Sequence, residues 1–180
     1  MPERRSGRVL SSLYDWVEAL VWALMVIVLL FLFVVRVVQV DGESMHDTLQ
    51  DGDRLVLRVV AYTPDYQDIV VVNRYTDEPL IKRVIALSGD TVYIDPDTGI
   101  LYVNGEPQQE NYVHYPNLTY DLHEEVTVPA GHVFVMGDHR NNSKDSRSRE
   151  VGFVNVKDIV GKVVFRYWPI RELGGVYDNL

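Results

Sequence analysis

Hydrophobic residues gather first in one long segment near the start of the chain. No charged residue interrupts the run from Ala19 to Val35, which as a helix would extend about 25 Å. Val37 and Val38 lengthen it, and Arg36 can extend its charged end toward lipid headgroups. A cleaved secretory signal and a buried core helix are the alternatives, but the run is longer than the usual apolar part of a signal and no pair of small residues follows it. We therefore predict a transmembrane anchor over residues 16–40.

Charges on either side of this segment indicate its orientation. Basic residues precede it and acidic residues follow it: Arg4, Arg5 and Arg8 before the segment, and Asp41, Glu43, Asp47, Asp51 and Asp53 after it. Clustered arginines favour the cytoplasmic side of a membrane. We predict a single-pass protein of the cell membrane, with residues 1–15 in the cytoplasm and residues 41–180 outside it.

Beyond the anchor the pattern changes to short runs rich in Val, Ile, Tyr and Phe, separated by Gly, Pro, Asn and Asp. These runs predict strands over 54–60, 69–74, 80–87, 91–94, 100–103, 126–128, 133–136 and 159–167. Polar stretches at 95–99 and 104–105 predict turns between neighbouring strands. The predicted fold class is therefore mainly β, an N-terminal transmembrane helix followed by an antiparallel β domain. Residues 95–130 are expected to form a small inserted β subdomain.

Composition narrows the chemistry. The net charge is −9 and is carried mostly beyond the anchor, which argues against nucleic acid as a partner. Disulfides, thiol nucleophiles and zinc–thiolate sites are excluded because the chain has no cysteine. The histidines beyond the anchor are too dispersed for helical metal-ligand spacing. We expect no metal and no cofactor, and the sequence leaves the oligomeric state open.

Lys82 lies inside an apolar predicted strand. Strand alternation places it on one face with Leu80, Val84 and Ala86. Burial there would disfavour the ammonium and lower its pKa to about 7–8, where a lysine can take a proton from a serine hydroxyl. The alternative from this strand alone is a lysine that extends out of an edge strand or pairs with a carboxylate.

Ser44 follows the predicted anchor in a polar loop that contains Gly42. A serine in such a loop is commonly a turn residue. A second polar cluster, residues 137–147, follows the very apolar strand 133–136 and is either a solvated tip or a set of positioned functional groups. Lys82 and Ser44 together indicate a membrane-tethered serine protease that uses a Ser/Lys pair.

Three segments of the sequence resemble the motifs of the bacterial type I signal peptidases. The matching positions are Gly42, Ser44, Met45, Thr48, Leu49, Gly52 and Asp53, then Lys82, Arg83, Val84, Gly89 and Asp90, and then Gly137, Asp138, Arg140, Asn142, Ser143, Asp145, Ser146 and Arg147. Their order follows the family order and extends over nearly the whole chain. The resemblance implies a serine endopeptidase that removes signal peptides from secreted preproteins, cutting after a segment with small residues first and third before the scissile bond.

The resemblance also assigns roles to individual residues. Ser44 would attack the scissile carbonyl, Lys82 would act as its base, and Ser143 would hold the lysine amine. Asp145 and Arg147 would form a supporting ion pair. Gly42 and Met45 fall in the region expected to meet the substrate and its oxyanion. The Ser44 backbone N–H would be the first oxyanion donor. Some relatives add a hydroxyl at the position of Gly42, so a second donor would have to come from elsewhere. The partners implied are secretory preproteins and membrane lipid.

The sequence departs from the family motifs at three positions. Asp47 replaces a usual proline, His139 replaces an asparagine, and Gln67 lies where glycine is common. His139 beside Asp138 also suggests a Ser/His/Asp triad, but adjacent residues on extended backbone point in opposite directions. Other open alternatives are a self-cleaving Ser/Lys repressor fold with an added anchor, a membrane-anchored β receptor without activity, and a homologue with a narrow range of clients.

Overall fold

The computed structural model describes residues 3–33, 35–73, 78–114, 117–118 and 121–177. The side chains of residues 3–11 and 30–35 are outside this description, as is part of the predicted strand 69–74. Contacts divide the chain into two units, residues 1–36 and residues 37–180.

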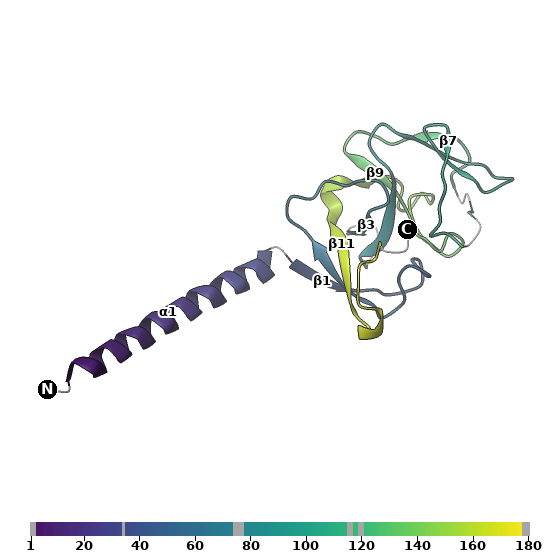
Figure 1. Ribbon diagram of the computed structural model, residues 1–180. Coiled ribbons are helices and arrows are strands. Elements are labelled where there is room, and N and C mark those ends of the chain that lie inside the picture. The colour runs from purple at the N-terminus through teal and green to yellow at the C-terminus, as the bar shows by residue number, and fades with distance from the viewer. Residues whose placement is uncertain (1–2, 34, 74–77, 115–116, 119–120, 178–180) are drawn as a thin grey trace. The chain divides into compact units, whose positions relative to one another are not determined.

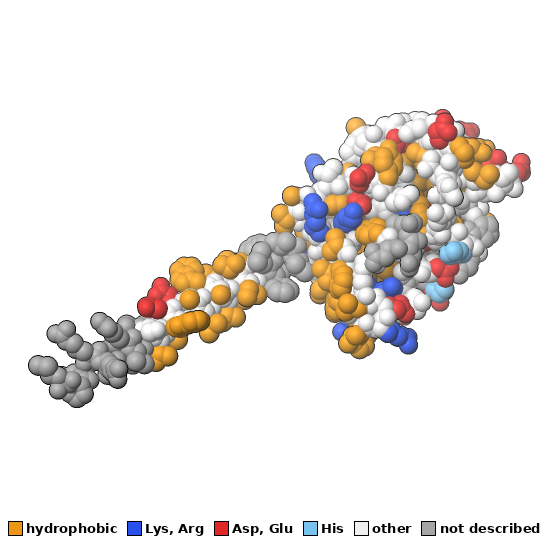
Figure 2. Space-filling model, in the orientation of Figure 1, with side chains coloured by type: hydrophobic (Ala, Val, Ile, Leu, Met, Phe, Trp, Pro, Cys, Tyr) orange, Lys and Arg blue, Asp and Glu red, His pale blue; other side chains and the backbone are white. Residues whose placement is uncertain are grey.

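The first unit is a single long helix, α1 (Glu3–Phe33) (Figure 1). Residues 12–29 within it are long enough and apolar enough to cross a membrane, with a mean hydropathy of 1.7. All the side chains in that stretch are exposed, and the described part of the helix shows mainly hydrophobic side chains in Figure 2. An exposed surface of this composition is unfavourable in water, so the helix fits the expected membrane span.

The helix ends earlier than the expected anchor over 16–40. Residues Val35–Gln39 form a strand, β1, at the edge of the large sheet. The apolar pattern continues from helix to strand without a break because the valines at this point suit either a membrane helix or a sheet. Hydrophobicity alone therefore did not locate the boundary.

The second unit contains two sheets, and every pairing with a described register is antiparallel. The large sheet has seven strands in the order β1-β2-β11-β3-β4-β9-β10. After β1 these are β2 (Arg54–Arg58), β3 (Ile69–Val72), β4 (Leu80–Ala86), β9 (His132–Met136), β10 (Val154–Asn155) and β11 (Ile159–Trp168). Strand β4 is interior, with Lys82 directly opposite Val70 of β3 and Arg83 opposite Met136 of β9.

The smaller sheet has the order β7-β6-β5-β8. Its strands are β5 (Thr91–Ile94), β6 (Leu101–Val103), β7 (Glu106–Pro107) and β8 (Val126–Thr127). Asn104 and Gly105 have φ values of 54° and 79°, the left-handed pair that a tight hairpin turn requires. The sheet lies in the expected 95–130 region of the sequence but begins four residues earlier, with β5. Two short 3-10 helices complete the unit, η1 (Val156–Asp158) and η2 (Ile170–Glu172).

Three clusters of buried hydrophobic residues hold the second unit together. One contains Met45 and Leu49 with residues of β2, β3, β4 and β11. A second joins the ends of β4 and β9 to the smaller sheet, and the third lies around β3, β4, β9 and β10. The mainly β fold is thus confirmed. Strands β7 and β10 were not predicted, because two residues are too few to show an alternating pattern.

Candidate active site

Ser44 lies on a tight turn, residues 43–50, which we call the Ser44 turn. Backbone hydrogen bonds close its base, from Val40 N to Asp53 O at 2.8 Å and from Gly52 N to Val40 O at 3.0 Å. Met45 and Leu49 are buried in the hydrophobic core, with exposed fractions of 1% and 0%. These two side chains fix the turn to the sheet and leave Ser44 half-buried at the surface.

The Lys82 side chain meets Ser44. Its Nζ lies 2.5 Å from Ser44 Oγ and also donates to the Ile81 carbonyl at 3.0 Å. Only 2% of Lys82 is exposed, which confirms its predicted place in an apolar row. Burial lowers the pKa of the Lys82 ammonium to about 8, although the Asp145 and Asp138 carboxylates oppose this shift. A neutral amine at this position can accept the Ser44 proton.

Residues 137–147, called the 137–147 loop below, pack directly against the Ser44 turn. His139 N donates to the Ser44 carbonyl at 3.1 Å. A Cβ at Gly137 would lie 2.2 Å from Ser143 Oγ and 2.4 Å from Ser44 O, distances that no side chain tolerates. Glycine is therefore required at position 137 because the Ser44 turn and Ser143 both approach its backbone closely.

Ser143 is 8% exposed, and within the described residues its hydroxyl has no hydrogen-bond partner. The expected contact between Ser143 and the Lys82 amine is therefore not formed in this structure. Lys82 instead directs its hydrogen bonds to Ser44 and to the Ile81 carbonyl. Ser143 lies beside the site, through its close approach to Gly137, but does not hold the lysine here.

Asp145 and Arg147 form a buried ion pair within the 137–147 loop. Arg147 Nη2 and Nε donate to the two carboxylate oxygens of Asp145 at 2.8 and 2.9 Å. Asp145 also accepts from Gly137 N at 3.0 Å. Burial alone would raise the pKa of Asp145, but Arg147 and the Gly137 N–H together hold it below its usual value. The nearby Ser143 hydroxyl adds to this lowering, although its geometry falls short of a hydrogen bond.

A second buried ion pair joins β4 to the 137–147 loop. Arg83 Nε and Nη2 donate to the carboxylate of Asp138 at 2.9 and 2.6 Å, and both side chains are fully buried. Thr48 Oγ1 donates to the same carboxylate at 2.6 Å. Asp138 thereby connects β4 to the Ser44 turn. From the sequence, Arg83 and Asp138 were matching motif positions without an assigned role. The signal that could have found their pairing is Arg83 itself, because a charged residue inside an apolar strand needs a buried partner.

Two residues expected near the substrate are placed differently. The Gly42 N–H donates to Asp51 Oδ1 at 2.9 Å, so it is already engaged within the protein. Met45 points into the core rather than toward Ser44. The Gly42 N–H and the Met45 side chain are therefore both engaged elsewhere in this structure.

Comparison with known proteins places this chain in a family. The family model described as "Signal peptidase, peptidase S26" matches residues 13–168, most of the chain. The chain belongs to the signal peptidase family. Signal peptidase IB of Staphylococcus aureus is 33% identical to it, over 90% of this chain and 93% of the relative. Signal peptidase I of Bacillus licheniformis is 36% identical, over 96% of this chain and 98% of the relative.

This signal peptidase is a hydrolase, as the family and its named relatives show. A crystal structure of a signal peptidase I from Enterococcus faecalis is 30% identical and has a TM-score of 0.48, covering 56% of this chain and 97% of that chain. Residues 13–168, the region that the family model matches, contain all the candidate site residues.

The departures from the family motifs have clear backbone consequences in this signal peptidase. Asp47 has a φ of 77°, which a proline ring, fixed near −65°, cannot adopt, so the Ser44 turn takes a path closed to proline. Gln67 has a φ of 64°, a conformation natural to glycine, and its carbonyl accepts from Arg83 at 3.0 Å. His139 Nδ1 contacts the Glu43 carbonyl at 3.1 Å, while the Asp138 carboxylate is held by Arg83 and Thr48, an arrangement unlike a triad.

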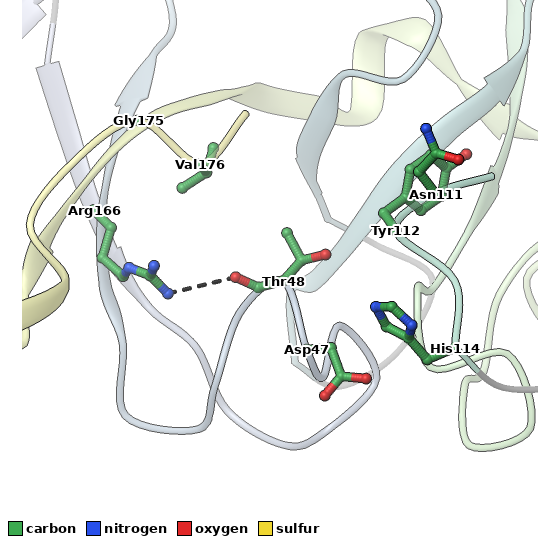
Figure 3. A pocket seen from close by; sticks show the side chains of 8 residues that line it. All are labelled: Asp47, Thr48, Asn111, Tyr112, His114, Arg166, Gly175 and Val176. Atoms are coloured by element: carbon green, nitrogen blue, oxygen red, sulfur yellow. Dashed lines mark hydrogen bonds between the residues drawn. The ribbon is translucent and has the colours of Figure 1, made fainter. Parts of the chain in front are cut away.

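A cavity of about 200 Å³ lies beside the Ser44 turn of this signal peptidase. Figure 3 shows the residues that line it: Asp47, Thr48, Asn111, Tyr112, His114, Arg166, Gly175 and Val176. Arg166 reaches from β11 to the Thr48 carbonyl at 3.4 Å and pairs with Asp53 at 2.9 Å. Asp47 pairs with His46 at 2.9 Å. Because these charges are already matched inside the protein, we assign no ligand to this cavity. No group of three or more His, Asp or Glu side chains suited to a metal occurs among the described residues.

Proposed function

We propose that this signal peptidase is a membrane-anchored serine endopeptidase that removes signal peptides from secretory preproteins, with Ser44 as nucleophile and Lys82 as general base. One observation carries the assignment, the 2.5 Å approach of Lys82 Nζ to Ser44 Oγ. Burial of Lys82 supports it, since a pKa near 8 leaves a useful fraction of neutral amine at neutral pH.

The reaction divides into acylation and deacylation. The neutral Lys82 amine takes the proton of the Ser44 hydroxyl as Oγ bonds to the scissile carbonyl carbon. The resulting ammonium then gives that proton to the departing amine of the mature chain, which leaves the signal peptide as an ester on Ser44. Lys82, neutral again, takes a proton from water as the water oxygen attacks the ester. The Lys82 ammonium then returns this proton to Ser44 Oγ, and the signal peptide is released.

The negative charge on the carbonyl oxygen needs a donor in place before the reaction. In the described part of the chain, no group accepts from the Ser44 backbone N–H, so this donor is open to the oxyanion. One such donor contributes about 3–4 kcal/mol to the transition state. The Gly42 N–H, bonded to Asp51, would have to change partner to contribute.

The 137–147 loop acts as the support of this site. Gly137 has no side chain, so Ser44 and Ser143 can approach its backbone closely. The Gly137 N–H donates to Asp145, whose ion pair with Arg147 holds this segment in place. In this account Asp145 and Arg147 are positioning residues. Ser143, whose hydroxyl is buried and unpaired among the described residues, is available to bond the Lys82 ammonium once Ser44 gives up its proton.

Helix α1 acts as the membrane anchor, with the N-terminus in the cytoplasm and residues 41–180 outside it. Its exposed apolar stretch over residues 12–29 and the arginines that precede this stretch support the topology. A preprotein held in the same bilayer by its signal peptide is then presented at a raised effective concentration.

Cleavage of a preprotein in detergent tests the function. The full chain should release a mature product whose new N-terminus follows a segment with small residues first and third before the cut. Ser44→Ala should release none while keeping its melting temperature. Equal cleavage by the Ser44→Ala chain would overturn the assignment of the nucleophile, and no cleavage by either chain would overturn the proposed function.

A further inference from the structure

A polar groove of about 430 Å³ lies along the outer side of the 137–147 loop. It is lined by Asn141, Asn142, Ser143, Lys144, Ser148 and Glu150. All six side chains can donate or accept hydrogen bonds, and none is apolar. The groove therefore suits a polar, extended peptide better than an apolar one.

One end of this groove reaches the Ser44 turn. Ser143 lines the groove and lies beside Ser44 at the crowded Gly137 backbone. Asn142 Nδ2 contacts Glu43 Oε2 at 3.5 Å, next to Ser44 in the chain. A peptide bond attacked by Ser44 thus has the start of the groove directly beside it.

The neighbours of Lys82 and the lining of the groove differ in exposure. Val84 and Val70, the residue opposite Lys82 on β3, are both fully buried and offer no surface to a peptide. Asn141, Asn142, Lys144 and Glu150 of the groove are exposed. The mature chain is the more polar part of a preprotein, and it is therefore the part that suits this groove.

We propose that the groove binds the first few residues of the mature chain, and that Lys144 and Glu150 select for charge among them. This inference rests on the proposed function. Lys144 follows Ser143 directly in the chain and lines the same groove as Glu150, and three extended residues of substrate cover about 10 Å.

Lys144 and Glu150 form an exposed ion pair, which a charged substrate side chain can displace. The two side chains are 51% and 68% exposed. An exposed pair contributes little stability, so a substrate carboxylate competes readily for Lys144 and a substrate ammonium for Glu150. Reversing the charge at Lys144 should consequently reverse the selection, because two carboxylates would then face the substrate.

Three substrates with one signal peptide test the inference, carrying Ala, Asp or Lys at the third mature position. The full chain in detergent at low salt is compared with Lys144→Glu and with Lys157→Glu, an exposed lysine of η1 whose reversal changes the net charge equally. Relative to the Ala substrate, Lys144→Glu should lower kcat/KM for the Asp substrate by about threefold and raise it for the Lys substrate by a similar factor. Lys157→Glu should leave both ratios as in the unmodified chain.

The outcomes distinguish failure of the groove assignment from failure of the proposed function. Unchanged substrate ratios in Lys144→Glu, or equal changes in Lys157→Glu, would overturn the groove assignment while cleavage of the Ala substrate left the proposed function intact. Failure of the unmodified chain to cleave even the Ala substrate would overturn the proposed function, and the groove assignment with it.

Discussion

Lys82 Nζ and Ser44 Oγ lie 2.5 Å apart although their residues are separated by 38 positions in the chain. Two independent supports bring them together. Lys82 is fixed in the interior strand β4, and the Ser44 turn is fixed by the buried side chains of Met45 and Leu49. The reacting pair is thus positioned by the hydrophobic core rather than by local sequence.

The pH dependence of cleavage should report the Lys82 amine. Burial lowers its pKa to about 8, and only the neutral form can act as a base. We expect kcat/KM to fall about tenfold per pH unit below pH 8 and to level off above it. A pH–rate profile between pH 5 and 9 checks this, and a rate that stayed constant down to pH 5 would contradict it.

Removing the Lys82 charge should stabilise the fold at neutral pH. The folded-state pKa, about 8, lies below the unfolded value of 10.5, so burial of the ammonium destabilises the protein fully below pH 8, and stability rises with pH between the two values. Lys82→Met should therefore raise the free energy of unfolding at pH 7 by up to about 3 kcal/mol. The loss of the two hydrogen bonds that Lys82 donates reduces this gain. Melting of both chains in detergent at pH 7 and pH 10 checks this. An equal difference at the two pH values would argue against a buried charge.

Breaking the Asp145–Arg147 pair should destabilise the protein strongly. Asp145→Asn leaves the Arg147 guanidinium buried without a counter-charge, which costs about 3–5 kcal/mol. Glu150→Gln is the matched control, because it makes the same chemical change in an exposed pair and should cost less than about 1 kcal/mol. Denaturant unfolding of the two variants decides the matter, and similar losses in both would show that burial of the pair is unimportant.

Gly137→Ala should damage the site more than the fold. The added Cβ would overlap Ser143 Oγ and Ser44 O, so the Ser44 turn must move away from Lys82. Gly161→Ala is a control in strand β11, where a Cβ would lie 2.7 Å from the Arg58 carbonyl. Both variants should melt at lower temperature, but at a temperature where both are folded only Gly137→Ala should lose activity. Full kcat/KM in folded Gly137→Ala would rule out this crowding.

Much of the fold could be predicted from alternation and turn residues. The strand at Thr91–Ile94 was located at its observed bounds, and the burial of Lys82 followed from its apolar neighbours. The strand Val35–Gln39 was missed because its valines extend the apolar helix pattern, which does not reveal where a helix ends and a sheet begins.

The site was less accessible to pattern reasoning. Ser44 was singled out only together with Lys82 and the predicted anchor, and the family resemblance then gave it a role, since one serine in a polar loop has no distinctive signal. The Arg83–Asp138 pair joins residues 55 positions apart, and single-sequence patterns carry no information on such pairing. Backbone requirements also stayed hidden: the left-handed conformation of Asp47 appears only in the folded turn.

The most direct measurement of the central claim is kcat/KM for preprotein cleavage by full-length Lys82→Met, beside Lys157→Met as a control for loss of one lysine. Melting curves establish that both chains are folded. The account predicts that Lys82→Met loses at least about 10³-fold in kcat/KM and that Lys157→Met matches the unmodified chain. A folded Lys82→Met chain that kept kcat/KM within about tenfold of the unmodified chain would contradict the assignment of Lys82 as the base.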